Sequence, residues 1–296
     1  MSVLVIGSCN VDISVSVSTL PKKGETLLGH EINYSFGGKG ANQAVACGKL
    51  GADVTFLSCV GNDDHGLKIR DYLESVNVKC DRIKVSPSLP TGTAIISIDA
   101  EGQNTIVVIA GANSECDVDY LKANEEAFQD CEYVLLQMEI PLDAIEYAIE
   151  CAKKYNKKVV LNPAPALSNF NGHLYPLIDY LTPNETELEI MAHSNSSMDE
   201  NIQTLLNQGV KNVLVTVGDK GAYFVNHEMK QLVPTIKVDA IDTVGAGDCF
   251  NGAFVSALSR GLSDLEAIRF ANKASSIAVT RKGAQESIPT IEEMNN

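Results

Sequence analysis

Short, continuous apolar runs alternate with amphipathic stretches along most of this chain. The runs predicted as buried strands are residues 3–6, 54–60, 133–137, 158–161, 180–182 and 213–217. Stretches with helical spacing lie between them, for example 40–50, 66–76 and 142–155. Continuous apolar strands that alternate with helices are typical of a parallel sheet covered on both faces. The pattern therefore predicts an α/β protein, although it does not give the order of the strands.

Two segments depart from this alternation of apolar runs and helical stretches. Residues 11–17 alternate strictly between apolar and polar side chains, and 26–34 form a second extended stretch. Residues 91–98 and 105–110 flank a hairpin loop at 99–103 that contains Gly102. Alternation with a period of two predicts an antiparallel sheet with one face in water. We interpret the four strands as a small β-lid inserted twice into the α/β core; ordinary edge strands are the alternative.

Length and composition place the chain among globular proteins. Its 296 residues allow two domains or one large α/β domain with an insertion. A hydrophobic content of 45% supports a sizeable core and excludes disordered, collagen-like and coiled-coil classes. The first residues lack the basic region of a signal peptide, and no apolar run reaches the roughly 18 residues of a membrane span. We therefore expect neither.

The chain is strongly acidic, with 38 acidic and 23 basic residues and a formal net charge of −15. Without clustered Lys and Arg, nucleic acid and membrane surfaces are disfavoured as partners. A helix terminus could still bind a small anion locally. The eight cysteines form no C-x-x-C pair, and the five histidines are too scattered to complete zinc sites. This usage indicates reduced core thiols and a cytoplasmic protein.

The strongest local motif is Asp242-Thr243-Val244-Gly245-Ala246-Gly247-Asp248, followed by helical spacing at 249–261. The glycines let the backbone turn tightly and approach a ligand closely. The free N–H groups of a helix N-terminus suit a transferring phosphoryl group, and Asp248 could take the proton from an attacking hydroxyl. The alternative is a glycine turn with Asp248 as a plain N-cap.

A second glycine motif, Phe36-Gly37-Gly38-Lys39-Gly40-Ala41-Asn42-Gln43, also precedes a helix. It matches neither the P-loop nor the dinucleotide G-x-G-x-x-G pattern. Lys39 and Asn42 could donate to hydroxyls or phosphate; a flexible turn with a solvated Asn42 is the alternative. Asn10 and Asp12 follow the first strand, where they could bind vicinal sugar hydroxyls. A solvent-facing Asp12 is the competing interpretation.

Three further segments follow predicted strands or helices. In Thr182-Pro183-Asn184-Glu185-Thr186-Glu187, the spacing of Asn184 and Glu187 predicts a capping box. In a phosphotransferase the Glu187 carboxylate could also hold the water shell of a Mg²⁺ ion. The turn at 216–221 could form the wall of a nucleotide site or a simple hairpin. The segment 280–287 could wrap a ligand or cation, or only cap the preceding helix.

Together these segments resemble the ribokinase branch of the PfkB sugar-kinase family over nearly the whole chain. The likeness rests on the glycine motifs at 37–44 and 242–248, on Asn162-Pro163-Ala164-Pro165-Ala166, and on 182–187 and 280–285. It implies a three-layer α/β/α core with a mostly parallel central sheet and a small β-sheet lid, the β-clasp. Residues 1–296 would be one kinase domain, with lid strands inserted at about 12–35 and 90–110. The implied reaction transfers the γ-phosphate of ATP to the 5-hydroxyl of D-ribose, and the lid often serves as a homodimer interface.

The resemblance also assigns roles to residues at matching positions. Asp248 would be the catalytic base, with an anion hole formed by Gly245, Ala246 and Gly247. The sugar site would comprise Asn10, Asp12, Gly38, Lys39, Gly40, Asn42, Glu139 and Asp248. ATP would contact Asn184, Thr216, Val217, Gly218, Asp219, Lys220, Gly221, Gly247, Asp248 and Asn272. Mg²⁺ would lie near Asn184 and Glu187. A K⁺ site would use Asp242, Val244, Ala278, Arg281, Gly283 and Ser287, several of them through backbone carbonyls.

Two alternatives stay open at this stage, and a third is set aside. A kinase for another sugar or a nucleoside would share these motifs, because specificity depends on a few lid contacts. A non-catalytic sugar sensor has no need of a base at Asp248, so the intact motif argues against it. A nicotinamide dehydrogenase would carry G-x-G-x-x-G after the first strand, where this chain has Gly7-Ser8-Cys9-Asn10-Val11-Asp12.

Overall fold

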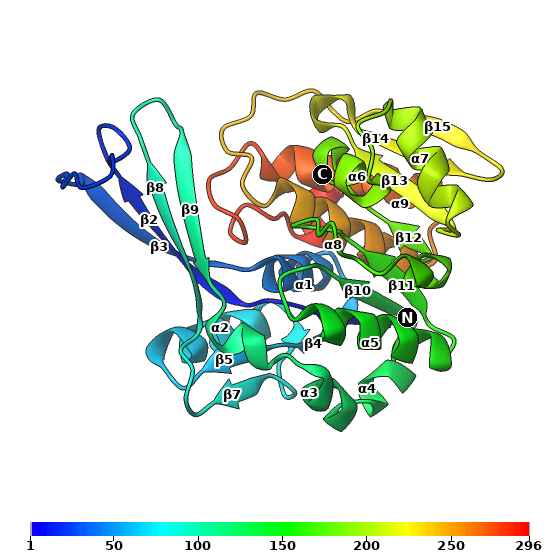
Figure 1. The fold of residues 1–296 in the computed structure, drawn as a ribbon, viewed down its shortest axis with the longest axis horizontal. Helices are drawn as coiled ribbons and strands as arrows, with labels where there is room; N and C mark the ends of the chain where they lie inside the picture. The colour runs from blue at the N-terminus through cyan, green and yellow to red at the C-terminus, as the bar shows by residue number, and fades with distance from the viewer. Residues whose placement is uncertain (1, 296) are drawn as a thin grey trace.

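A nine-stranded sheet forms the centre of the computed structural model, which describes residues 2–295 (Figure 1). Its strand order is β15-β14-β13-β12-β11-β10-β1-β4-β6. The pairs from β12–β13 to β4–β6 are parallel, and only β13–β14 and β14–β15 are antiparallel. The strands are β1 (Ser2–Ile6), β4 (Asp53–Leu57), β6 (Val78–Lys79), β10 (Tyr133–Leu136), β11 (Lys158–Leu161), β12 (Tyr180–Leu181), β13 (Asn212–Thr216), β14 (Ala222–Asn226) and β15 (Lys230–Val233). The predicted mostly parallel sheet is confirmed.

Helices cover both faces of this sheet and enclose two hydrophobic cores. Alternate residues of β1 divide between them, with Val3 and Val5 in one core and Leu4 and Ile6 in the other. One core includes α1 (Lys39–Lys49), α2 (Asp64–Ser75), α8 (Ala246–Ser259), α9 (Asp264–Ala278) and α10 (Ile291–Met294). The other includes η1 (Gly111–Glu115), α3 (Val118–Ala123), α4 (Glu126–Gln129), α5 (Leu142–Lys154), η2 (Gly172–Leu177), α6 (Glu185–Ala192) and α7 (Met198–Asn207). The strands are apolar on both faces because each face is packed against helices.

One predicted strand divides into two. The run at 54–60 becomes β4 of the main sheet and β5 (Cys59–Gly61), which pairs in parallel with β7 (Lys84–Ser86) in a separate two-stranded sheet. Ser58 lies between them, where its N–H donates to the Tyr120 hydroxyl and its own hydroxyl donates to the carbonyl of Gly7. These hydrogen bonds take the place of strand-to-strand hydrogen bonds at Ser58. The single strand that hydrophobicity predicts over 54–60 is therefore wrong.

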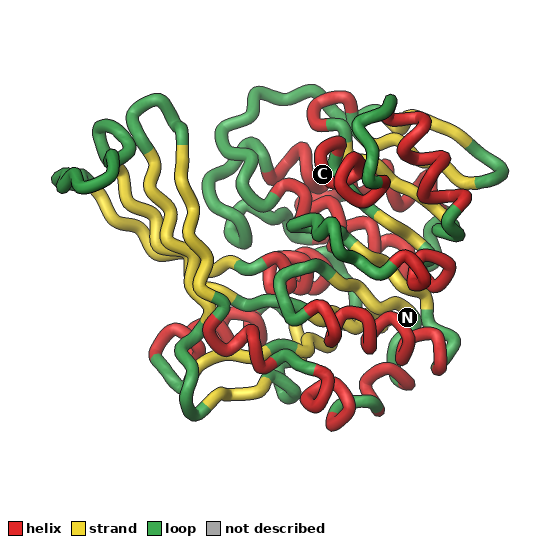
Figure 2. Tube along the Cα trace, in the orientation of Figure 1, coloured by secondary structure: helices red, strands yellow, loops and turns green. Residues whose placement is uncertain are grey.

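Four strands project from the body as a separate sheet with the order β3-β2-β8-β9 (Figures 1 and 2). They are β2 (Asn10–Ser16), β3 (Glu31–Gly37), β8 (Gly92–Ile98) and β9 (Asn104–Ile109). The predicted small sheet outside the main one is confirmed, and edge strands of the main sheet are excluded. The stretch expected from residue 26 begins as a strand only at Glu31.

The projecting sheet differs in two ways from the antiparallel, one-face-wet sheet that we expected. Its central pair β2–β8 is parallel, and only β2–β3 and β8–β9 are antiparallel. The reason is that β2 and β8 both leave the body outwards, whereas β3 and β9 return to it (Figure 1). In addition, β9 is exposed at every position. The sheet stands clear of the body, so water reaches both faces of this strand.

The remaining expectations concern cysteines and membrane segments. All eight cysteines are buried free thiols, as predicted. Among residues 2–295 no helix combines the length and the apolar character needed to cross a membrane.

Candidate active site

The N-terminus of α8 opens onto two adjoining cavities. The larger has a volume of about 590 Å³ and the smaller about 240 Å³. They share the lining residues Asn184, Thr216, Thr243, Ala246 and Gly247. A ligand in one cavity would therefore meet a ligand in the other at the first turn of α8.

Gly245 sets the direction from which the chain enters α8. It is the N-cap residue, with a φ of 72° in the left-handed region, and a Cβ there would lie 3.0 Å from the Cβ of Ala284. The N–H of Ala246 donates to the carbonyl of Thr243, and that of Cys249 to Gly245. The N–H groups of Gly245, Gly247 and Asp248 find no acceptor within residues 2–295. The helix N-terminus thus presents free donors and its positive end to the cavities.

Asp248 lies in the first turn of α8 and lines the smaller cavity. Its Oδ2 accepts a hydrogen bond from Nδ2 of Asn42 at 2.9 Å, and its Oδ1 accepts one from Nε2 of Gln43 at 2.9 Å. Gly245 occupies the N-cap position, so the interpretation of Asp248 as a plain N-cap is wrong. Asn42 is 6% exposed, which also excludes the flexible turn with a solvated amide.

The start of α1 lies beside the same cavity. Gly38 is its N-cap with a φ of 86°, and a Cβ on Gly38 would lie 2.9 Å from the backbone nitrogen of Asn10. Gly40 lies as closely against the backbone of Gly7. Lys39 lines the smaller cavity, and its backbone N–H donates to Oε2 of Glu139 at 3.0 Å. The glycine motif at 36–43 therefore brings α1 against the ends of β1 and β10.

Four carboxylates lie around the Lys39 ammonium group or beside one another at the start of α1. Burial alone lowers the pKa of Lys39, but the carboxylates of Asp248, Glu139 and Glu187 outweigh it and leave that pKa raised. Burial, followed by the charges of Glu139 and Asp248, raises the pKa of Asp12 to about 6. Asp12 is half-buried and its carboxylate packs beside Gly37, so the solvent-facing interpretation does not hold.

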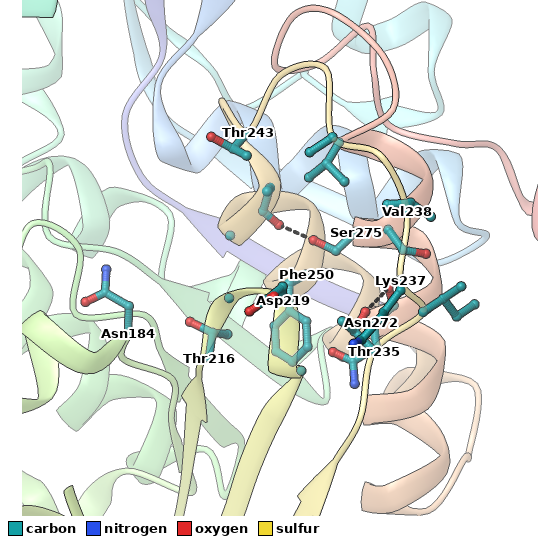
Figure 3. Close-up of a pocket in the computed structure, with 18 of the residues that line it drawn as sticks. Asn184, Thr216, Asp219, Thr235, Lys237, Val238, Thr243, Phe250, Asn272 and Ser275 are labelled. Atoms are coloured by element: carbon teal, nitrogen blue, oxygen red, sulfur yellow. Dashed lines mark hydrogen bonds between the residues drawn. The ribbon is translucent and has the colours of Figure 1, made fainter. Parts of the chain in front are cut away.

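The larger cavity lies between the β13–β14 turn and the segment that follows β15. Asn184 and Thr216 lie on one side of it, and Lys237 and Val238 lie on the other (Figure 3). Of the predicted ATP contacts, it is lined by Asn184, Thr216, Gly218, Asp219, Gly221, Gly247 and Asn272. Val217, which is buried, and Lys220, which is exposed, do not line it. The predicted turn at 216–221 is η3 (Gly218–Lys220) between two antiparallel strands.

Asn184 and Glu187 form the capping box of α6 that their spacing predicts. Asn184 Oδ1 accepts from the Glu187 N–H at 2.8 Å, and Glu187 Oε2 accepts from the Asn184 N–H at 2.9 Å. Both residues also line the smaller cavity. Burial raises the pKa of Glu187. The cap therefore orients a carboxylate towards the cavity as well as starting the helix.

Most of the predicted K⁺ residues lie on two loops, which are connected through hydrogen bonds to the Asp242 carboxylate. This carboxylate accepts the N–H of Val244 and the N–H of Gly283, each at 3.0 Å. The guanidinium of Arg281 binds Glu293 instead. Ala278 closes α9, and the Ser287 hydroxyl donates to the carbonyl of Ala284. No cluster of three or more His, Cys, Asp or Glu side chains that could hold a metal occurs in the described part of the chain.

Several polar residues of this site had no role in the sequence-based assignment. They are buried amides and hydroxyls behind Asp248: Gln43, Gln137, Asn162, Thr182, Asn251 and Gln285. Asn162, for example, accepts from Gln43 and donates to the carbonyl of Thr182. Phe250 also lines the larger cavity. For Gln43, Gln137 and Asn251 the sequence held a usable signal, since each is an amide in an otherwise apolar segment.

Residues 1–291 match the family described as pfkB family carbohydrate kinase. The chain belongs to this family. It is 41% identical to a ribokinase of Staphylococcus aureus over 299 residues, which cover 99% of this chain and 98% of that protein. A ribokinase of Haemophilus influenzae is 40% identical over 293 residues, 98% and 95% of the two chains. A deoxyribokinase of Salmonella typhi is 36% identical over 299 residues, covering 100% and 98%.

Solved structures agree with the sequence comparison. The ribokinase of Thermotoga maritima superposes with a TM-score of 0.91 at 40% identity, covering 99% of this chain and 98% of that one. The Arabidopsis thaliana ribokinase, complexed with ribose and ATP, has a TM-score of 0.91 at 32% identity and covers 99% and 97%. The chain is therefore an ATP-dependent sugar kinase of ribokinase-like fold, and neither a sensor nor a dehydrogenase.

Proposed function

We propose that this kinase transfers the γ-phosphate of ATP to the 5-hydroxyl of D-ribose, with Asp248 as the catalytic base. The observation that carries the proposal is the position of Asp248, a buried carboxylate beside free N–H donors where the two cavities meet. We also propose that residues 1–296 are one kinase domain whose lid strands are inserted at about 12–35 and 90–110. The buried free thiols support a cytoplasmic location.

The chain's own groups account for the chemistry. Asp248 accepts the proton of the attacking hydroxyl, while Lys39 lies near it in the smaller cavity. Phosphoryl transfer depends on positioning and on stabilising charge more than on covalent steps. The N-terminus of α8 supplies free N–H groups and a positive helix end where negative charge develops on the phosphoryl oxygens. The free donors here are the N–H groups of Gly245 and Gly247, which belong to the predicted anion hole of Gly245, Ala246 and Gly247, and that of Asp248 next to it.

The remaining assignments follow the cavities. The sugar would bind by the smaller one, near Asn10, Asp12, Gly38, Lys39, Gly40, Asn42 and Glu139. ATP would occupy the larger one, and Asn184 and Glu187 would hold Mg²⁺. Glu187 Oε1 has no hydrogen-bond partner within residues 2–295, and a carboxylate oxygen that is free to accept from water fits an ion that keeps most of its waters. When bound, Mg²⁺ neutralises charge on the phosphate oxygens.

The decisive experiment measures ADP release from ATP and Mg²⁺ with D-ribose, 2-deoxyribose, fructose, adenosine or no sugar, in the presence of K⁺. Turnover that depends on ribose and exceeds the other substrates would support the proposal. Faster turnover with 2-deoxyribose is the competing result, because a deoxyribokinase is among the relatives. Faster turnover with another substrate would keep the mechanism and reject ribose.

Sugar binding should weaken in acid. With a pKa of about 6, Asp12 is ionised at neutral pH and can accept two sugar hydroxyls. As the pH falls through 6, protonation removes an acceptor, so KM for the sugar should rise by up to about tenfold per pH unit. In Asp12→Asn the KM should be high and nearly constant over the same range. A wild-type KM that is constant from about pH 5 to about pH 8 would contradict this role of Asp12.

We also propose that K⁺ binds between the loops that Asp242 joins, next to the start of α8. Ordering these loops would fix the donors at Gly247 and Asp248, so K⁺ should raise kcat above its value in buffer that contains only Na⁺. Removing the Asp242 carboxylate in Asp242→Ala should abolish the difference between the two ions. Identical wild-type rates in both buffers would argue against an activating cation.

The lid is proposed to form a homodimer interface. Tyr34, Ile95 and Val107 are exposed by 61%, 42% and 61% and lie in one row across the sheet through Ile13. An apolar row of this kind needs a covering partner. Light scattering should give twice the chain mass, and Val107→Glu should give one chain mass. Leu67→Glu, an exposed position on α2, is the control that should stay dimeric. A monomeric wild type would reject the interface.

A further inference from the structure

Two chains of buried amides end at the carboxylate of Asp248. Gln43 Nε2 donates to Oδ1 and Asn42 Nδ2 donates to Oδ2, both at 2.9 Å. The side-chain oxygen of each inner amide is occupied in turn by an outer amide. Gln137 Nε2 donates to Gln43 Oε1 at 2.7 Å, and Gln285 Nε2 donates to Asn42 Oδ1 at 2.9 Å. Each carboxylate oxygen thus has one inner and one outer amide, and in the Gln43 half the inner NH₂ group also donates to Asn162 Oδ1 at 3.0 Å.

This arrangement is fully buried and incompletely satisfied. The three glutamines are 0% exposed and Asn42 is 6% exposed. The unpartnered buried atoms include Gln137 Oε1 and Gln285 Oε1, which are the outermost oxygens of the two chains. A buried acceptor without a donor destabilises the folded state, and apolar side chains would fill the same space without that penalty. Folding stability alone therefore does not explain four amides at these positions.

The direction of the hydrogen bonds indicates what the outer amides do. A primary amide can turn either its NH₂ group or its oxygen towards a neighbour. An inner amide that turned its oxygen towards Asp248 would repel the carboxylate. The outer N–H groups of Gln137 and Gln285 bind the inner oxygens and so favour the orientation in which both inner NH₂ groups face Asp248. The donors are thereby oriented before any substrate binds.

We propose that Gln137 and Gln285 are positioning residues, which act through Gln43 and Asn42 to hold the Asp248 carboxylate in the geometry for accepting the substrate proton. The inference rests on the proposed role of Asp248 as the base. The two chains attach the base to separate parts of the fold, because Gln137 follows β10 whereas Gln285 lies in the loop after α9. Gln285 is also two residues from Gly283, whose N–H binds Asp242.

Substitution of the outer amides tests this without touching Asp248. Gln137→Met and Gln285→Met keep the side-chain length and remove the hydrogen bonds. Each should lower kcat by about 3–10-fold and change the KM for sugar and ATP by less than about twofold, because the base is displaced only slightly. Gln43→Met should lower kcat by about 10–100-fold. The double variant Gln43→Met/Gln137→Met should be no slower than Gln43→Met alone, since Gln137 acts through Gln43.

Asn201→Leu is the matched control. Asn201 is a buried amide on α7 with an unpartnered Oδ1, and its Nδ2 donates to the carbonyls of Ser194 and Ser196. This variant should lose stability yet keep kcat, and melting curves would show that every variant is folded. The proposal fails if folded Gln137→Met and Gln285→Met both keep kcat within about twofold of the wild type, or if the losses of the double variant multiply. Near-normal turnover in Asp248→Asn would instead reject the base itself.

Discussion

Replacing Asp248 by asparagine should lower kcat by about 10²–10⁴-fold and leave the KM for the sugar nearly unchanged. Asparagine keeps the size of the side chain, but its single oxygen can accept from only one of the two donors, Asn42 Nδ2 or Gln43 Nε2. It also has no carboxylate to accept the proton of the attacking hydroxyl, so the transition state loses an interaction, whereas the lost internal hydrogen bond does not involve the sugar. The measurement is steady-state kinetics with ATP and Mg²⁺, together with calorimetric titration of the sugar.

Asp248→Ala separates the lost base from an altered hydrogen-bond network. Alanine leaves the donors of Asn42 and Gln43 without an acceptor, so this variant should also have a lower melting temperature. If both variants bind the sugar and both have very low kcat, Asp248 is the base. If Asp248→Asn retains more than about a third of the wild-type kcat, another group accepts the proton, and the assignment drawn from the geometry is wrong.

Two glycines of α8 should give opposite results when changed to alanine. A Cβ on Gly252 would lie 2.4 Å from the Cβ of Ala46 and 2.6 Å from the carbonyl oxygen of Gln43. Gly252→Ala should therefore lower the free energy of unfolding by about 1–3 kcal/mol, because α1 and α8 must move apart. A Cβ on Gly247 meets no atom within 4 Å, so Gly247→Ala should leave stability unchanged or slightly raised.

Although Gly247→Ala should keep its stability, its catalytic activity should fall. Its added methyl group would enter the space at the start of α8 that both cavities share, where the phosphoryl group is proposed to pass. Displacing that group by about 1 Å would lower kcat/KM for ATP by about 10²-fold. Thermal unfolding and kinetics on the two variants provide the comparison. A fully active Gly247→Ala would mean that the transferred phosphoryl group does not pass the start of this helix. An unchanged melting temperature in Gly252→Ala would mean that α1 and α8 accommodate the methyl group without a loss of stability.

The sequence predicts local structure of the site well. Glycines at 38 and 245 precede helices, as expected, because each supplies a positive φ that the chain needs immediately before α1 and α8. The capping box of Asn184 and Glu187 forms as its spacing predicts. Each of these features depends on residues within a few positions of one another, so the chain around them is sufficient to specify them.

Failures of the sequence-based interpretation share a physical cause. The run at 54–60 is uniformly apolar, yet Ser58 interrupts it by bonding with Gly7 and Tyr120, which lie 51 and 62 residues away. The alternation in β2 predicts a strand, but its partner and direction depend on where both lid segments leave the body. Neither piece of information is present in the local pattern.

By itself the sequence determined the α/β class, the alternating strands of the small sheet and the two glycine motifs, because periodicity and turn chemistry act over short stretches of chain. Only the tertiary structure decided which side chains surround Asp248. Its partners Gln43 and Asn42 are 205 and 206 residues away, and Gln285 reaches Asn42 across 243 residues. Contacts at such separations form only when packed helices and strands bring the segments together. Their geometry therefore reflects the free energy of the whole core rather than of any one segment.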